Sequence, residues 1–132
     1  LGEVGQALSS LVVELKGFGQ EKKGIAGFFQ KKRNEMEAMK AAWANFKGRP
    51  QELGLPSAPA QFLRYFEEPD RPQTRLDRMN EGGMQISIGR LRPDTQYDYK
   101  FVCLSHNTLR GAAGGAVELA ELLAAEGYIT RK

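Results

Sequence analysis

Two side chains in this sequence are of types that perform covalent chemistry, and they lie close together. Cys103 is the single cysteine and could act as a nucleophile, and His106 is the single histidine and could act as a base. Cys103, however, alternates with Tyr99 and Phe101 in a strand pattern, which favours a small buried side chain. His106 stands just before a helix pattern, where structural capping is favoured. We therefore assign no catalytic residue from the sequence.

Several arginines could bind anions, and each has a simpler interpretation. Arg110 could meet a phosphate or a carboxylate, but pairing with a surface Asp or Glu is favoured. The segment RPQTRLDR at 71–78 interleaves its arginines with acids, including Asp77, which indicates a local network of ion pairs. One cysteine and one histidine also leave no credible zinc cluster and no internal disulfide, so no metal site is predicted.

The first elements that would position these groups are a strand and a long helix. Residues 8–16 are apolar and β-branched and predict a strand, and the glycine-rich residues 17–27 predict a loop. From about 28 to 47 the period becomes helical. We expect its apolar stripe to face the core, and the alternative is a docking face for a partner helix. The stripe consists of Phe29, Met36, Met39, Trp43 and Phe46.

The middle of the chain predicts a small sheet. Residues 48–59 read as a rigid connection, 61–66 as a short strand, 67–83 as a long polar loop, 84–89 as a strand, 90–95 as a turn and 97–104 as a second strong strand. The fold class predicted is therefore α+β: a mostly antiparallel sheet with helices on one face, followed by a C-terminal helix.

The C-terminal helix pattern, 109–127, has a face of small and apolar residues and a natural stop at Gly127. Its early glycines each cost roughly 1 kcal/mol relative to alanine, so we expect another group to approach this helix closely. We also expect other protein subunits to cover the face, because an apolar stripe of this length is rarely left exposed. The residues assigned to that contact are Leu109, Ala112, Ala113, Ala116, Ala120 and Leu123.

Length and composition bound the function. The chain has 132 residues, enough for a single domain, and a net charge of +3, which is too small an excess to indicate nucleic-acid binding. No apolar run approaches the roughly 18 residues of a membrane span. The sequence begins at Leu1, so we expect it to be processed, trimmed or part of something longer. It does not identify a compartment: bacterial cytoplasm, plastid and mitochondrion all remain open.

Several segments in one order resemble the C-terminal domain of aspartate-semialdehyde dehydrogenase. They are PQELGLPSAP (50–59), RPQTRLDR (71–78), GGMQISIGRLR (82–92), YDYKFVCLSHNTLRGAAGG (97–115) and AELLAAEGYI (120–129). The resemblance covers about residues 43–130, and weakly 8–15. We therefore expect one domain of this kind over 1–132, with 1–47 divergent and 48–132 similar to the family.

The resemblance implies a two-domain enzyme that reduces aspartyl phosphate with NADPH through a cysteine thioester. Its C-terminal domain, related to that of glyceraldehyde-3-phosphate dehydrogenase, carries the sheet used for dimerisation, so a homodimer through the sheet is expected. Asn107 would lie near the nicotinamide, with Arg110 as a second cofactor contact, if a nucleotide-binding partner is present; the alternative for Asn107 is a helix cap. The 71–78 segment would lie toward subunit contacts.

The chain lacks the motifs that bind the nucleotide and carry out catalysis in that family. It has no G-x-G-x-x-G segment, and Gln6-Ala7 stand where the family's Gly-His pair would align. Two hypotheses follow. The favoured one is a non-catalytic relative with a structural role in a larger protein assembly, binding no cofactor alone. The alternative is the C-terminal part of an active NADP-dependent dehydrogenase of amino-acid biosynthesis, completed by a separate nucleotide-binding domain.

Overall fold

The computed structural model describes Gln6 and residues 24–131. The predicted strand at 8–16 and most of the predicted loop at 17–27 lie outside these residues. In chain order the elements are α2 (Ile25–Asn45), α3 (Arg49–Glu52), β1 (Leu63–Phe66), α4 (Thr74–Asp77), the 3-10 helix η2 (Asn80–Gly83), β2 (Ile86–Pro93), β3 (Tyr99–Leu104), the π-helix η3 (Leu109–Ala113) and α5 (Gly114–Ala125). The predicted α+β class is confirmed.

The sheet has three strands in the order β1-β2-β3. β1 runs parallel to β2, with Tyr65 opposite Ile88, and β2 runs antiparallel to β3, with Ile88 opposite Cys103. The sheet is therefore mixed, where the sequence predicts a mostly antiparallel one. The reason is the long excursion through α4 and η2, which returns the chain to the start of β1 before β2 begins. β1 and β2 can then run in the same direction.

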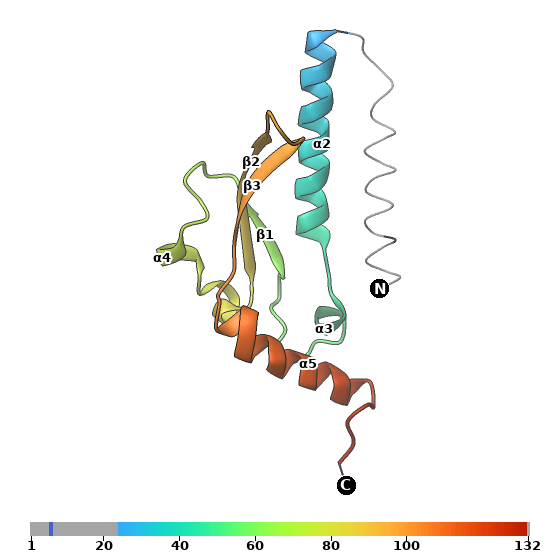
Figure 1. The fold of residues 1–132 in the computed structure, drawn as a ribbon. Helices are drawn as coiled ribbons and strands as arrows, with labels where there is room; N and C mark the ends of the chain where they lie inside the picture. Colours follow the sequence, from blue (N-terminus) through green and yellow to red (C-terminus); the bar gives the residue numbers. More distant parts are fainter. Residues whose placement is uncertain (1–5, 7–23, 132) are drawn as a thin grey trace.

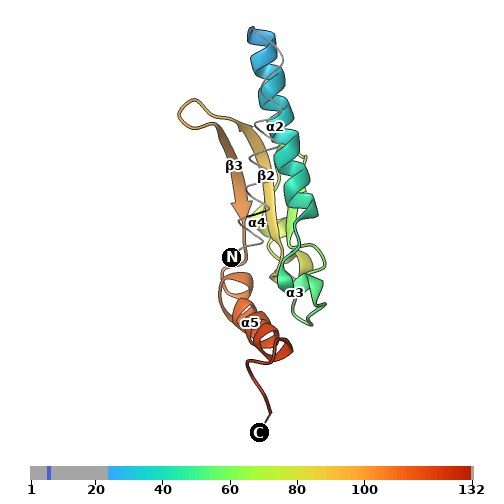
Figure 2. The same cartoon turned by 90° about the vertical axis from the view of Figure 1, so that its right-hand side faces the viewer.

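α2 covers one face of the sheet. Its Trp43 ring stacks on Tyr65 with centroids 5.8 Å apart and meets Phe101 at 5.2 Å, while Phe46 meets Phe62 at 5.6 Å. The C-terminal part of the predicted stripe is thus directed inward. Its first member is not: Phe29 is 64% exposed. Figures 1 and 2 show why, since the N-terminal end of α2 extends past the end of the sheet.

Two lysines also attach α2 to the sheet. Lys32 lies 4.4 Å from the ring of Tyr99 and pairs with Asp98 at 3.2 Å. Lys40 lies 4.9 Å from the ring of Tyr65 and pairs with Glu67 at 3.0 Å. No residue of α2 is fully buried, so these cation–π and ionic contacts supplement the aromatic packing of Trp43 and Phe46.

The other face of the sheet is covered by residues 67–83 rather than left open. The Arg71 guanidinium lies over the Phe66 ring at 4.7 Å, and the backbone carbonyl of Arg71 and the Pro72 ring lie directly against Gly89. α5 lies across the end of the sheet, beneath both layers (Figures 1 and 2). The helices are thus distributed around the sheet and not gathered on one face as predicted.

The buried apolar interior of the described residues is small. Five apolar side chains are buried there, those of Pro59, Phe66, Pro72, Met84 and Ile88. Among the described helices, none has the length and apolar content needed to cross a bilayer.

Three boundaries predicted from the sequence are wrong. Residues 25–27 belong to α2 and not to a loop, because the amide of Phe28 donates to the Gly24 carbonyl and closes the first turn. The predicted turn at 90–95 is strand through Pro93: Arg90 takes a positive φ of 57° and the register shifts at this point, so that β2 bends and continues. The predicted loop at 67–83 contains α4 and η2.

Candidate functional site

Arg110 is partly buried, with 20% of its side chain exposed. Its Nη1 donates to Oε2 of Glu118 at 2.7 Å, and its guanidinium lies 4.5 Å from the Phe62 ring. The Glu118 side chain is 5% exposed, and its other oxygen, Oε1, is buried without a hydrogen-bond partner. The predicted pairing of Arg110 with an acid is therefore observed, although at a buried position. A role for Arg110 in binding a cofactor stays a prediction.

The turn before η3 is capped by a histidine. Nδ1 of His106 accepts a hydrogen bond from the amide of Leu109 at 3.2 Å, and its carbonyl accepts from the amide of Gly111 at 2.9 Å. Structural capping by His106 is thus confirmed. Asn107 is exposed, and its side chain forms no hydrogen bond with the described residues, so the cap predicted for Asn107 is made by His106 instead. The cofactor contact predicted for Asn107 remains untested.

The glycines of this helix permit close approach, as the sequence predicts. A Cβ on Gly114 would lie 2.6 Å from Sδ of Met84 and 2.8 Å from the carbonyl oxygen of Leu109. The group that comes close is therefore the buried Met84 at the C-terminal end of η2, together with the wide turn η3 that precedes α5. This contact locks α5 against the end of the sheet.

α5 turns its acids inward. Besides Glu118, the carboxylate of Glu121 accepts from the amide of Ser57 at 2.9 Å and from its hydroxyl at 2.8 Å. At the C-terminal end, Glu126 pairs with Arg49 at 2.8 Å. The underside of α5 is thus fastened to the rest of the molecule by carboxylates.

The outer side of α5 is apolar. Val117 and Leu119 are 52% and 55% exposed. Of the six residues predicted to be covered by a partner, Leu109 and Leu123 are half-buried, and four are exposed: Ala112, Ala113, Ala116 and Ala120. A helix of a globular protein ordinarily buries its apolar side and exposes its charges. α5 does the reverse.

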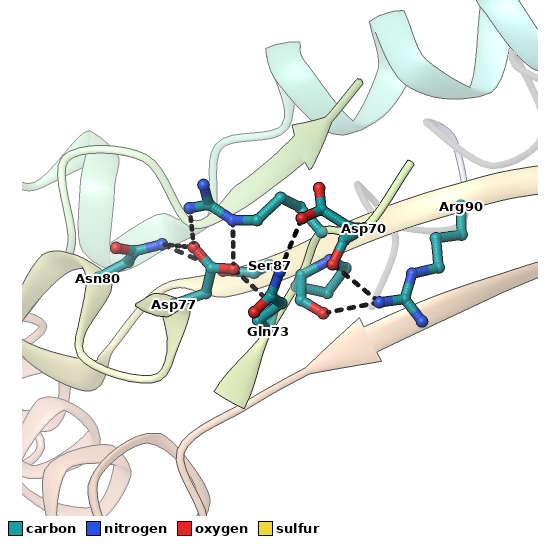
Figure 3. A network of polar contacts seen from close by, with 8 residues as sticks. Asp70, Gln73, Asp77, Asn80, Ser87 and Arg90 are labelled. Atoms are coloured by element: carbon teal, nitrogen blue, oxygen red, sulfur yellow. Dashed lines mark hydrogen bonds and ion pairs between the residues drawn. The ribbon is translucent and has the colours of Figure 1, made fainter. Parts of the chain in front are cut away.

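A second polar cluster fixes the segment that covers the sheet (Figure 3). Asp77 is 1% exposed and receives hydrogen bonds from Nε and Nη2 of Arg71, from the amide of Gln73 at 2.7 Å and from the side chain of Asn80 at 3.3 Å. Asn80 also reaches the buried Ser87 hydroxyl at 3.4 Å. These donors, led by Arg71, lower the pKa of Asp77 to about 2. The predicted network in 71–78 exists, and its central acid is buried and not exposed.

Cys103 is exposed, so the predicted burial of this side chain is wrong. The reason lies in the position of α2, which covers Tyr65 and the adjacent part of the sheet and leaves the end of β3 open. Partial burial nevertheless raises the pKa of the Cys103 thiol, which is the direction opposite to nucleophile activation. Among the described residues, no group of three His, Cys, Asp or Glu side chains is arranged to hold a metal ion.

Comparison with known proteins places this geometry in a family. The family described as "Semialdehyde dehydrogenase, dimerisation domain" matches residues 24–110. This chain is a member of the semialdehyde dehydrogenase dimerisation-domain family. The recognition made from the sequence motifs is thereby confirmed.

Relatives of this family share the domain within longer chains. The chain is 45% identical to aspartate-semialdehyde dehydrogenase of Aspergillus fumigatus over 70% of its own length and 26% of the relative's. It is 44% identical to malonyl CoA reductase (NADP) of Metallosphaera sedula over 76% of its length and 28% of the relative's. The crystal structure of aspartate semialdehyde dehydrogenase with NADP from Candida albicans matches with a TM-score of 0.63 and 42% identity, covering 70% of this chain and 26% of that one. The chain thus spans about a quarter of these relatives.

Proposed function

We propose that this chain is a non-catalytic, semialdehyde-dehydrogenase-like subunit whose role is structural: it associates with other protein subunits through the outer side of α5. The observation that carries this proposal is the reversed polarity of α5, which buries Glu118 while Val117 and Leu119 face solvent. Exposed apolar surface of this kind marks protein contacts, and the small residues between these side chains would allow a partner to approach closely.

The inner contacts of α5 support the proposal because they prevent the helix from rotating its apolar side inward. Such a rotation would expose Gly114 and break three carboxylate contacts, those of Glu118, Glu121 and Glu126. A buried carboxylate that loses its partner costs about 3–5 kcal/mol. Binding of another protein therefore removes the apolar side of α5 from water at a lower free-energy cost than rotation of the helix.

The state of the two reactive side chains supports a non-catalytic role. The pKa of the Cys103 thiol is raised, and Nδ1 of His106 is occupied by the Leu109 amide. Asn107 and Arg110 remain our proposed NADP contacts only for an assembly that supplies a nucleotide-binding domain, and Arg110 would first have to leave Glu118. The two relatives named above carry names with different substrates, so we assign no substrate to the shared domain.

The proposal is tested on the full-length gene product that contains this sequence, purified from its source under gentle conditions. We expect a complex heavier than the chain itself, disrupted by Ala116→Asp on the outer side of α5. Thr95→Asp, on the exposed β2–β3 turn, is the matched control and should leave the complex intact. The purified complex should not oxidise NADPH with an acyl phosphate, and in the reverse assay it should not reduce NADP+ with a semialdehyde and phosphate.

Two results would end this proposal. A complex that survives Ala116→Asp unchanged would show that α5 is not the contact. A complex containing a nucleotide-binding subunit, with NADPH-dependent turnover, would establish the alternative, in which the chain completes an active dehydrogenase.

A further inference from the structure

A hollow lies at the C-terminal end of β1. The strand pairs with β2 only as far as Phe66 and Gly89, whereas β2 continues to Pro93. The hollow beside this continuation has a volume of about 450 Å³. We call it the β1-end hollow. Its charged and hydroxyl-bearing lining residues are Lys40, Tyr65, Glu67, Glu68, Arg90 and Arg92.

The two arginines of the hollow are oriented by neutral acceptors. Nη2 of Arg90 donates to the carbonyl of Asp70 at 2.9 Å and to that of Pro72 at 3.5 Å (Figure 3). Nη1 of Arg92 donates to the Arg90 carbonyl at 2.7 Å. Within the described part of the chain neither guanidinium forms an ion pair. Because a carbonyl fixes the direction of a guanidinium without neutralising it, both groups keep their charge and further N–H donors.

The other groups in the hollow leave this positive charge uncompensated. Lys40 and Glu67 pair with each other at 3.0 Å. Glu68 forms no ion pair among residues 24–131, so it offsets one of the two guanidiniums and the net charge stays positive. The hydroxyl oxygen of Tyr65 accepts from the Leu91 amide at 3.2 Å, which leaves its hydrogen for another acceptor. This small excess fits a single oxyanion group, whereas a nucleic acid requires a larger basic surface.

The backbone at Arg90 is an independent sign of a binding role. Its φ of 57° lies in the left-handed region, which residues other than glycine seldom adopt, and the register with β3 shifts at this point. Bulges redirect side chains beside binding sites, and strained residues gather at ligand contacts. Glycine would satisfy this backbone without strain. Arginine adds a guanidinium, and its contacts with the segment that covers the sheet use only Nη2.

We propose that the β1-end hollow binds a small oxyanion, a carboxylate or a phosphate, through the guanidiniums of Arg90 and Arg92 and the hydroxyl of Tyr65. The volume of the hollow lies in the range of small-molecule sites. Charged N–H donors also make the strongest hydrogen bonds to carboxylates and phosphates. The described residues that line the hollow include none from α5, so this site is separate from the association surface proposed above.

The test measures the binding of two probes, inorganic phosphate and acetate, to the full-length protein at low ionic strength. In the proton–nitrogen NMR spectrum the Nε–Hε signals of Arg90 and Arg92 should shift and saturate, with a dissociation constant on the order of 1 mM. Arg92→Gln should weaken binding by about tenfold or more, followed at the Arg90 signal. Saturation by phosphate alone would assign a phosphate ligand, and saturation by acetate alone would assign a carboxylate. Saturation by both supports the site for either group.

Two further variants separate anion binding from folding. Arg90→Gly removes the guanidinium but accepts the positive φ, so it should keep the path of β2 and bind about tenfold or more weakly. Arg75→Gln is the matched control, because Arg75 is exposed on α4 and does not line the hollow. It should bind both probes as the unchanged protein does. Circular dichroism should show the same fold for all of these chains.

The inference is wrong if neither probe gives a saturable shift at Arg90 and Arg92, or if Arg92→Gln binds as tightly as the unchanged protein. It is also wrong if Arg75→Gln weakens binding to the same extent, or if sodium chloride at equal ionic strength gives the same shifts. Overall charge, and not this hollow, would then attract the anion. None of these results bears on Ala116→Asp, so the role proposed for α5 stands or fails separately.

Discussion

Replacing Asp77 by asparagine tests whether a single buried carboxylate fixes the segment that covers the sheet. The acid receives hydrogen bonds from Arg71, the Gln73 amide and Asn80, and it is 1% exposed. Asp77→Asn keeps the shape but removes the charge and directs an amide donor at another donor. We expect the variant to be less stable by about 2–4 kcal/mol at neutral pH.

The pH dependence gives a sharper test. The pKa of Asp77 falls from 3.8 to about 2 on folding, a shift that corresponds to about 2 kcal/mol. Since the Arg71 side chain is 25% exposed, solvent screening reduces our expectation to about 1–2 kcal/mol. Because the folded pKa is lowered, this stabilisation is complete above the unfolded pKa and is lost as the pH falls through the folded one.

Urea unfolding followed by circular dichroism, at a series of pH values from 6 down to 2, measures this contribution. The free-energy gap between the unchanged chain and Asp77→Asn should shrink by the same 1–2 kcal/mol on acidification. Asp70→Asn is the matched control, because Asp70 is exposed and its carboxylate contacts only Gln73 among the described side chains. A gap that stays constant across this pH range would refute the argument.

Three further predictions concern the α5 region and β3. Gly114→Ala should destabilise the fold by about 1–3 kcal/mol, whereas Gly111→Ala, which has ordinary space around its new methyl group, should be neutral or slightly stabilising in the same unfolding assay. Arg110→Met should lower the free energy of unfolding by about 3–5 kcal/mol, because it leaves the buried Glu118 carboxylate without a partner. Adding Glu118→Leu should recover most of that loss, and the prediction is contradicted if the effects of the two substitutions simply add. Cys103 should react with iodoacetamide more slowly than a free cysteine at neutral pH and accelerate only at alkaline pH, and fast neutral labelling would contradict its raised pKa.

Local patterns predicted much of the fold. The spacing of Met36, Met39, Trp43 and Phe46 identified the inner side of α2, and the alternation in 97–104 identified β3. The continuation of β2 past residue 89 could not be predicted, because Arg90 adopts a positive φ that is unusual for an arginine. The parallel pairing of β1 with β2 could not be predicted either. It depends on the path of the chain between the two strands and not on the residues of either strand.

Some features of the site were predicted and others were not, and the difference follows from what each residue type indicates by itself. His106 as a cap and Gly114 at a close approach depend on neighbours in sequence or on residue size, and both were recognisable. The burial of Asp77 and Glu118 was not. Each is paired with an arginine that only the folded chain brings into position, and Asp77 also accepts from the Gln73 amide. A charged residue in a sequence otherwise indicates a surface.

The small interior links these findings. With five buried apolar side chains among the described residues, two of them prolines, hydrophobic burial contributes less here than in a self-sufficient domain of this size. Polar contacts take its place: Arg71 with Asp77, Arg110 with Glu118, and the lysines that attach α2. Such contacts orient elements well but add little net stability once their desolvation is counted. The apolar outer side of α5 is held outward by its inner carboxylate contacts, those of Glu118 and Glu121. Association would therefore supply the burial that the single chain lacks, and stability should rise with protein concentration.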